Sequence, residues 1–370
     1  MMPHDDTSYM ARALELARRG RYTTHPNPRV GSVVVRDGEV VGEGWHHRAG
    51  EPHAEVLALR AAGERGRGGT VYVTLEPCSH FGRTPPCADA LIEAGVSRVV
   101  AAMADPNPQV AGQGLARLAA AGIETRVGVL EAEARALNAG FVSRMTRGRP
   151  RVRVKLAMSL DGRTAMASGE SQWITGAAAR ADVQRLRAES SAVLTGIGTV
   201  LKDRPSLNVR LEAEALGIEG PLRQPLRVIL DPELLTPVDL PMLGLDGQTL
   251  ILTASVDGVR QSALTAAGAE VMSLPGDAMA LDLHAVMAEL VRREINDLHV
   301  EAGSVLSGAL LAAGLVDELV IYMAPCLMGS EAHGLFHLPG IARMAERVRL
   351  TITDVRAVGE DWRITALPQD

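Results

Sequence analysis

The chain has 370 residues, of which 46% are hydrophobic and 22% charged, and this length and composition favour a folded protein of two domains. It lacks both a long apolar run and an apolar segment near its N-terminus, which argues against a membrane span and against an export signal. The net charge of −6 argues against nonspecific binding to nucleic acid. Its three cysteines are few and odd in number, which argues against a disulfide framework, so we expect a cytoplasmic protein.

The N-terminal part of the chain alternates between helical and strand patterns. An Asp37-Gly38 pair divides the apolar stretch 30–45 and predicts a β-hairpin. Helical spacing of apolar residues is found at 9–19, 54–65, 88–95 and 113–122, and strand patterns at 30–45, 70–75, 98–103 and 123–130. These patterns predict an α/β domain at residues 1–146, in which helices cover a mixed sheet.

A basic stretch with glycine and proline, TRGRPR at 146–151, is typical of a linker and predicts a second domain at 151–367. A second α/β series follows in the segments 152–162, 180–196, 225–231, 248–255, 283–295, 298–303, 304–314 and 317–325.

Two of the three cysteines lie close together in the motif LEPCSHFGRTPPC at 75–87, in a loop between a predicted strand and a predicted helix. Together with His53, at the start of another helix, Cys78 and Cys87 can supply three zinc ligands and leave the fourth position open for water. This pattern is typical of a catalytic zinc site. Glu55, two residues after His53, is the carboxylate that can move a proton without binding the metal.

His-x-Glu followed by Pro-Cys and a second cysteine is the signature of zinc deaminases that act on nucleosides and nucleobases. In this chain Cys87 follows Cys78 after eight residues, where the signature has two. The longer loop carries Arg83 and Thr84, which a deaminase of small bases would not need. A structural zinc is disfavoured because only three protein ligands are found.

Three motifs, PNPRVG (26–31), GEGWHHRAGEPHAE (42–55) and LEPCSHFGRTPPC, resemble the bifunctional deaminase/reductase family of riboflavin biosynthesis. The resemblance implies a cytidine-deaminase-like α/β/α domain followed by a dihydrofolate-reductase-like α/β domain. It implies zinc-dependent removal of the 2-amino group from a diaminopyrimidinone that carries a phosphoribosylamino group, and NADPH-dependent reduction of the ribosyl group to ribityl. The implied partners are this small molecule and further copies of the chain, in a dimer or tetramer, with no nucleic acid and no membrane.

The same resemblance assigns residues to the two sites. The residues that it places on the deaminase substrate are Asn27, His46, Arg83 and Thr84. The second domain carries the family motifs KLAMSLDGR (155–163), GESQWITG (169–176), TGIGTVLKDRPSLNVR (195–210) and VEAGS (300–304). The residues expected on the reductase substrate are Ser171, Arg187, Leu207, Arg210 and Glu301. Those expected on NADPH are Ala157, Trp173, Thr199, Asp203, Gly303 and Ser304. Ala302 departs from the family, which usually has glycine there, and its methyl group could crowd the cofactor.

Other features of the second domain are informative without the family. The turn at Gly303–Ser304 between a strand and a helix could present N–H groups to an anion, although plain strand–helix packing is the commoner use of such a turn. Arg187 and Arg210 suit bidentate binding of a phosphate. Asp161 could assist opening of the sugar ring or could form a turn. For Cys326 we expect a buried, inert thiol.

Two other functions stay open at this point. One is a zinc deaminase of tRNA or free nucleosides with an accessory C-terminal domain. The other is a nonenzymatic protein that binds NADPH or a phosphosugar and carries a structural zinc ion.

Overall fold

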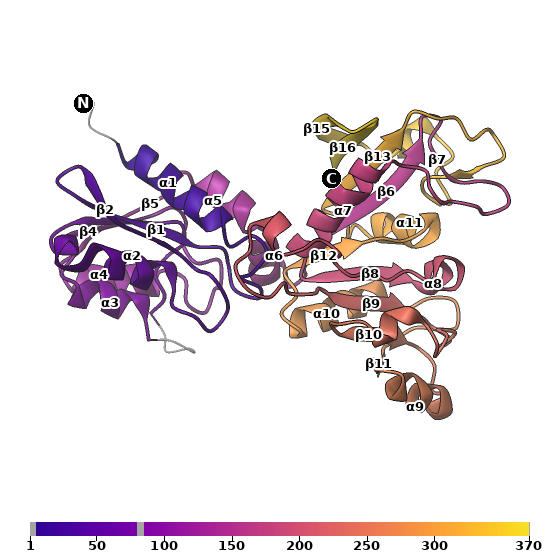
Figure 1. Ribbon diagram of the computed structural model, residues 1–370, viewed down its shortest axis with the longest axis horizontal. Coiled ribbons are helices and arrows are strands. Elements are labelled where there is room, and N and C mark those ends of the chain that lie inside the picture. The colour runs from indigo at the N-terminus through magenta and orange to yellow at the C-terminus, as the bar shows by residue number, and fades with distance from the viewer. Residues whose placement is uncertain (1–4, 80–84, 370) are drawn as a thin grey trace. The chain divides into compact units, whose positions relative to one another are not determined.

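The computed structural model describes residues 5–79 and 85–369 and divides into two compact units, 1–148 and 149–370 (Figure 1). Among the described residues, no helix is both long enough and apolar enough to cross a bilayer.

Unit 1 contains a five-stranded sheet in the order β2-β1-β3-β4-β5, in which β1 is antiparallel to β2 and β3, and β3, β4 and β5 are parallel. The strands are β1 (Gly31–Arg36), β2 (Glu39–Trp45), β3 (Thr70–Val73), β4 (Arg98–Ala101) and β5 (Glu124–Val127). The hairpin between β1 and β2 is confirmed: both Asp37 (φ 51°) and Gly38 (φ 80°) are left-handed, as a tight two-residue turn requires.

Helices cover both faces of this sheet. They are α1 (Asp6–Arg18), α2 (Ala54–Ala62), α3 (Cys87–Glu93), α4 (Gln113–Ala120), α5 (Glu131–Leu137) and α6 (Ala139–Arg147), with a 3-10 turn at Gly63–Gly66. Alternate residues of the strands point to opposite faces of the sheet and belong to two separate hydrophobic cores. Val33 and Tyr72 pack with α1, whereas Val34 and Val71 pack with α2, α3 and α4. Unit 1 is therefore the α/β/α layered domain that was predicted, although α5 and α6 were not.

Unit 2 is built on a nine-stranded sheet in the order β11-β10-β9-β8-β12-β6-β13-β16-β15. The strands are β6 (Arg151–Ser159), β8 (Ala192–Gly196), β9 (Leu226–Leu230), β10 (Thr249–Thr253), β11 (Ala269–Ser273), β12 (Asp297–Val300), β13 (Glu318–Ala324), β15 (Leu350–Val358) and β16 (Asp361–Pro368). The strands from β11 to β13 are parallel, and β16 and β15 extend the sheet as an antiparallel hairpin. Two short strands, β7 (Arg163–Ala165) and β14 (His333–Gly334), form a separate pair.

The helices of unit 2 also lie on both faces of the sheet. They are α7 (Ala177–Glu189), α8 (Ile197–Asp203), α9 (Gly258–Ala266), α10 (Leu283–Arg292) and α11 (Ser304–Ala312), with 3-10 turns at Glu214–Leu216, Pro241–Gly244 and Met344–Glu346. Residues of α10 and α11 share one core with Val154 and Val300. On the opposite face α7 packs against Val320 and Tyr322.

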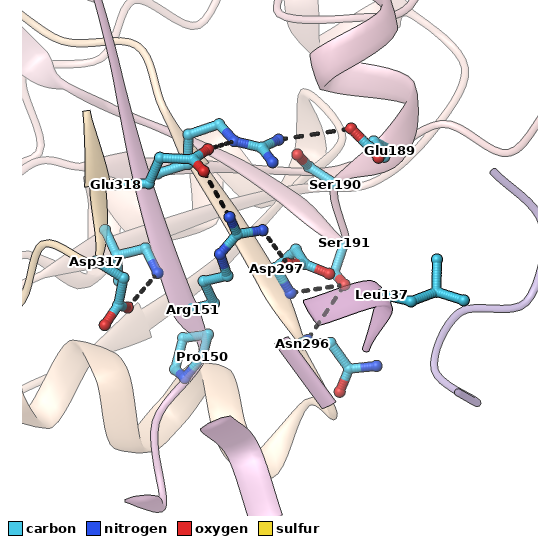
Figure 2. A network of polar contacts seen from close by, with 12 residues as sticks. Leu137, Pro150, Arg151, Glu189, Ser190, Ser191, Asn296, Asp297, Asp317 and Glu318 are labelled. Carbon is cyan, nitrogen blue, oxygen red and sulfur yellow. Dashed lines mark hydrogen bonds and ion pairs between the residues drawn. The ribbon is translucent and has the colours of Figure 1, made fainter. Parts of the chain in front are cut away.

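Charged residues join the starts of the central strands of unit 2 (Figure 2). Arg151 contacts Glu318 at 2.6 Å and Asp297 at 3.7 Å, so it links β6 to β13 and β12. Arg153 also contacts Glu318, at 2.5 Å, and Glu189 at the end of α7 at 3.7 Å. These contacts lie at the amino ends of the parallel strands, so the carboxyl ends are free to form a site.

Candidate active sites

His53, Cys78 and Cys87 come together in unit 1. Their ligand atoms all lie within 4.8 Å of one another. Nδ1 of His53 is 3.2 Å from Sγ of Cys87 and 3.6 Å from Sγ of Cys78. Tetrahedral zinc with ordinary bond lengths would place nitrogen and sulfur about 3.6 Å apart, so these three residues fit a zinc ion.

Close packing of α2 on β2 places His53. The helix begins directly after His53, and an added Cβ at Gly44 would lie 2.6 Å from the backbone nitrogen of Ala58. Only glycine in the strand allows this approach, which brings the first turn of α2 to the sheet. Cys87 is the first residue of α3, and its N–H donates to Sγ of Cys78 at 3.3 Å. This bond favours the Cys78 thiolate.

Glu55 lies in the first turn of α2 and is 3% exposed. Burial raises the pKa of its carboxyl to about 7, with a further rise from the Cys78 thiolate and an opposing effect from His53. A carboxyl that titrates near neutral pH can both accept and donate a proton, which general acid–base catalysis requires. The pKa of the Cys78 thiol is lowered to about 4, chiefly by its hydrogen bond with Cys87.

Glu76 anchors the loop that carries Cys78, and the sequence analysis did not identify it. Its carboxylate is 5% exposed and accepts hydrogen bonds from four backbone N–H groups. The donors and distances are Asp105 (3.0 Å), Gly112 (3.0 Å), Gly114 (2.9 Å) and Leu115 (3.4 Å). The sequence feature that could have identified Glu76 is an acidic residue between a buried strand and a cysteine expected to bind zinc.

Asn27 and His46, both expected on the deaminase substrate, lie beside the metal ligands. Nδ2 of Asn27 is 3.0 Å from Nε2 of His46, and the ring of His46 meets the ring of His53 edge to face at 5.3 Å. Nδ1 of His46 lies 3.2 Å from the carbonyl oxygen of Pro52. With Nδ1 donating to Pro52, Nε2 of His46 accepts from Asn27, and burial lowers the pKa of His46, which favours this neutral form. Arg83 and Thr84 fall outside the described residues.

A second polar site lies in unit 2, on the central parallel strands. Val154 and Val300 face one core, while the alternate residues Lys155, His299 and Glu301 are polar and lie on the other face, where His299 is fully buried and Lys155 and Glu301 are partly buried. Strands covered on both faces are normally apolar throughout, so polar residues at every second position are a signal of function. Of these three residues only Glu301 was expected at the site, and that expectation came from the family resemblance; Lys155 and His299 were not predicted.

Arg187 reaches Glu301 from α7. Its Nε donates to Oε1 at 2.5 Å and its Nη2 to Oε2 at 2.9 Å, while Nη1 donates to the carbonyl of Asn208 at 3.0 Å. The paired Arg187 guanidinium holds the pKa of Glu301 well below its usual range, against the effect of burial. Burial lowers the pKa of Lys155, opposed by Glu301 and reinforced by Arg187. The structure therefore brings together two residues that were expected on the reductase substrate, beside an additional, partly buried lysine.

Two helix N-termini lie next to each other at the carboxyl ends of β8 and β12. Both helices, α8 and α11, have a glycine at the N-cap position (Gly196 and Gly303), and no side chain in the described part of the chain caps either helix. An added Cβ at Gly196 would lie 3.2 Å from Cδ2 of Leu306 on α11, whereas one at Gly303 would meet nothing within 4 Å. Open N–H groups at paired helix ends fit the phosphates of a dinucleotide. The expected cofactor residues on these helices are Thr199, Asp203 and Ser304, and Ala157 lies on β6.

Several residues that were expected at the site in unit 2 lie outside the cluster of Lys155, Arg187, His299 and Glu301. Trp173 is 69% exposed and stacks with the guanidinium of Arg180 at 4.7 Å, and Ser171 lies in the same loop. Leu207 is 2% exposed and its side chain belongs to a core cluster, so only its backbone could meet a ligand. Arg210 has an exposed side chain, and neighbouring Arg187 contributes with burial to lowering its pKa.

The structure also shows the surroundings of three other residues of unit 2 that the sequence singled out: Ala302, Asp161 and Cys326. The methyl group of Ala302 packs against the apolar core. Asp161 accepts a hydrogen bond from the hydroxyl of Ser159 within its own turn, which favours its turn-forming alternative, and further bonds from the N–H groups of Met328 and Gly329, which tie this turn to a distant loop. The expectation of a buried Cys326 is wrong: its side chain is exposed, because the chain leaves the sheet at Ala324 directly before it.

Comparison with known proteins covers both units. The family model described as the cytidine and deoxycytidylate deaminase zinc-binding region matches residues 3–103, and the RibD C-terminal domain matches residues 150–364. The chain is 54% identical over 362 residues to riboflavin biosynthesis protein RibD of Escherichia coli, covering 96% of this chain and 97% of that protein. It is 50% identical over 376 residues to the RibD protein of Haemophilus influenzae, covering 98% of each.

Solved structures agree with these matches. The structure of Acinetobacter baumannii RibD, form 1, superposes with a TM-score of 0.91 at 44% identity, covering 99% of each chain. A Thermotoga maritima protein described as a diaminohydroxyphosphoribosylaminopyrimidine deaminase/5-amino-6-(5-phosphoribosylamino)uracil reductase superposes with a TM-score of 0.85 at 33% identity, covering 98% of this chain and 99% of that chain. With its zinc-binding deaminase region, its reductase domain and these full-length relatives, the chain belongs to the RibD family of riboflavin biosynthesis proteins.

Proposed function

We propose that this chain deaminates the pyrimidine ring of 2,5-diamino-6-(5-phosphoribosylamino)pyrimidin-4-one in unit 1 and reduces the ribosyl group of the product in unit 2. The observation that carries the proposal is the grouping of His53, Cys78 and Cys87 within 4.8 Å, beside a buried Glu55. The similarity to RibD proteins over both units supports the pairing of the two activities in one chain.

In the deaminase site, His53, Cys78 and Cys87 would hold zinc, which supplies an acidic water molecule as the nucleophile. Glu55 would take a proton from the attacking water and pass it to the departing amino group, so that the oxygen of water ends on the ring carbon and the amino group leaves as ammonia. Its raised pKa suits both transfers. Asn27, oriented by His46, offers an amide group to the pyrimidine ring. Arg83 and Thr84 stay assigned to the substrate by family resemblance.

In the reductase site, NADPH supplies the hydride that reduces C1 of the opened sugar. The glycine-capped ends of α8 and α11, with Thr199, Gly303 and Ser304, would bind its phosphates, and Asp203, at the carboxyl end of α8, stays assigned to another part of the cofactor by family resemblance. Ala157 and Trp173 complete the proposed cofactor contacts.

The sugar phosphate is the group that the arginines of this site can bind. Arg187 and Arg210 would hold it, with Ser171 and the backbone at Leu207 beside them. Glu301 would meet the sugar hydroxyl groups, and Lys155, a partly buried lysine beside it, is a candidate to provide the proton that the sugar oxygen requires.

One experiment tests both halves. The purified full chain is given the diaminopyrimidinone substrate with and without NADPH, while ammonia and NADPH absorbance are followed together. Ammonia release without NADPH, followed by NADPH consumption when it is added, is the expected result. Absence of ammonia release from a zinc-loaded protein would contradict the proposal. Deamination of tRNA or of free nucleosides would favour the first alternative function.

We further propose that the chain is a cytoplasmic homo-oligomer. Free thiols at Cys78, Cys87 and Cys326 are consistent with a reducing compartment. The edge strand β15 is exposed along almost its whole length, with apolar Ile352 61% and Val355 52% exposed. A second copy of the chain could cover an exposed edge strand of this kind by packing against it. Light scattering of the wild type and of Ile352→Lys tests this, because a monomeric wild type would contradict it.

A further inference from the structure

His299 is a fully buried imidazole in the middle of β12, with 0% of its surface exposed. Neither ring nitrogen makes a well-formed hydrogen bond to any residue of the described chain. An imidazole buried without partners destabilises a fold, whereas an apolar side chain of similar size does not carry this cost. Packing alone therefore gives no reason for histidine at this position.

The surroundings of His299 are those of the reductase site. Its Nε2 lies 3.4 Å from Oε1 of Glu301, which follows two residues later on the same face of the strand. Arg153 stands opposite His299 on β6, and Arg187 approaches from α7 through its pair with Glu301. Burial lowers the pKa of His299, so the ring is neutral near pH 7 and carries a single N–H. A proton on Nε2 would lie on the nitrogen that is 3.4 Å from Oε1 of Glu301, and a small shift of the Glu301 side chain would complete a hydrogen bond between them.

Glu301 needs a second donor if Arg187 is to serve a substrate. Both carboxylate oxygens of Glu301 depend on Arg187 in the structure. When a phosphate or sugar group binds Arg187, the guanidinium divides its N–H donors between that group and Glu301. A carboxylate that is shielded from water and has too few hydrogen-bond donors becomes protonated or moves.

Two other buried side-chain atoms near this pair in the chain's hydrogen-bonded neighbourhood lack a partner among the described residues. One is Oδ1 of Asn208, whose carbonyl accepts from Arg187, and the other is Oγ1 of Thr195, which follows the residue of β8 whose carbonyl accepts from the N–H of Glu301. Unpaired polar atoms gathered around an ion pair favour a pocket built for a polar ligand.

We propose that His299 is a positioning residue of the reductase site, which holds the Glu301 carboxylate ionised and aligned through Nε2 while Arg187 engages the substrate. This inference rests on the proposed reduction. His299 touches neither substrate nor cofactor, and it acts through Glu301 alone.

The test compares His299→Leu with His299→Gln in the full chain. Glutamine can place its amide nitrogen near the position of Nε2 and keep a donor for Glu301, whereas leucine cannot. Three quantities are measured for each variant: the melting temperature, the kcat and KM of NADPH-dependent reduction of 5-amino-6-(5-phosphoribosylamino)uracil, and the rate of deamination. Deamination is an internal control, since its site lies in unit 1.

His299→Leu is expected to melt at or above the wild-type temperature, to deaminate normally, and to lose about 10- to 100-fold in kcat/KM for reduction. His299→Gln is expected to recover most of that loss. Wild-type reduction by a folded His299→Leu variant, or an equal loss in both folded variants, would overturn the inference. Lack of reduction by the wild type itself would instead refute the proposed function, so the two failures are distinguishable.

Discussion

The carboxylate of Glu76 accepts a hydrogen bond from the backbone N–H of Gly114 at 2.9 Å, and this pair joins the zinc-ligand loop to the start of α4. The approach is close, because an added Cβ at Gly114 would lie 1.9 Å from the carbonyl oxygen of Pro77, directly before Cys78. Each oxygen of Glu76 accepts hydrogen bonds from two N–H groups. An NH2 group in place of either oxygen would therefore face two donors and could bond with neither. The position of Cys78 therefore depends on Glu76 and Gly114.

We predict that Glu76→Gln and Gly114→Ala each weaken zinc binding by about 10-fold or more, the range found when groups that orient metal ligands are removed. Zinc affinity is measured by competition with a chromophoric chelator, and cobalt substitution reports the ligand geometry by absorbance. Gly112→Ala is not a suitable control, because Gly112 is left-handed (φ 79°). Glu93→Gln on α3, whose carboxylate makes no hydrogen bond or ion pair among the described residues, is the matched control and should bind zinc as the wild type does.

Glu55→Gln should abolish deamination and leave both zinc content and reduction unchanged. Glutamine keeps the size of the side chain but cannot transfer the proton, and general acid–base catalysis contributes about 10²- to 10⁴-fold to rate. Ammonia release and metal content are measured on the same preparation. Loss of zinc from Glu55→Gln would mean that Glu55 holds the site together and does not act as the proton carrier.

Arg210→Ala should impair reduction mainly through KM, because the side chain is exposed beside Arg187 and is free to meet a phosphate. Removal of one charge-assisted contact predicts a rise in KM of about 10-fold or more, with deamination unchanged. Arg185→Ala, an exposed arginine on α7, is the control for the loss of one positive charge and should reduce normally. An equal loss of both activities in Arg210→Ala would show that the two sites are not independent.

Local patterns in the sequence predicted the elements that place the deaminase site. The Asp37-Gly38 turn is a local signal, and so is the helical pattern that begins after His53. The α9–β11 segment and the β15–β16 hairpin were not predicted. The β15 sequence alternates apolar and polar residues at 350–353, but a register shift between Ile352 and Asp354 interrupts the period of two, which leaves only short alternating runs.

The partners of buried polar residues could not be predicted from local sequence. Glu76 bonds with residues 29 to 39 positions away, and Arg187 pairs with Glu301 across 114 positions. Such pairs depend on which strands become neighbours, and hydrophobic periodicity does not encode strand order. Polar residues at alternate positions in a strand buried on both faces carry part of this information. Applied to 153–157 and 299–301, that rule would have identified Lys155 and His299.

Asp6 offers a test of stability in unit 1 that is separate from both sites. It lies at the start of α1, and its side chain, 16% exposed, accepts hydrogen bonds from Arg98 (2.8 and 2.9 Å), Arg126 (2.6 Å) and Tyr72 (2.8 Å). These donors tie α1 to β4, β5 and β3. The Arg98 hydrogen bonds are the largest cause that lowers the pKa of Asp6 to about 2 from an ordinary value of 3.8.

A carboxyl whose pKa is lower in the folded state stabilises that state at pH values above its unfolded pKa, and the contribution is lost as the pH falls toward the folded pKa. Asp6→Asn should therefore lower the free energy of unfolding by about 1–2 kcal/mol at pH 7, allowing for solvent screening. The difference from the wild type should stay constant between about pH 8 and pH 5 and shrink below about pH 4. Urea unfolding across this range measures it, with Asp37→Asn as the control, since Asp37 is 85% exposed and asparagine suits its left-handed turn position. A difference that grows as the pH falls would contradict the assignment of the ionised Asp6 as the group that joins α1 to the sheet.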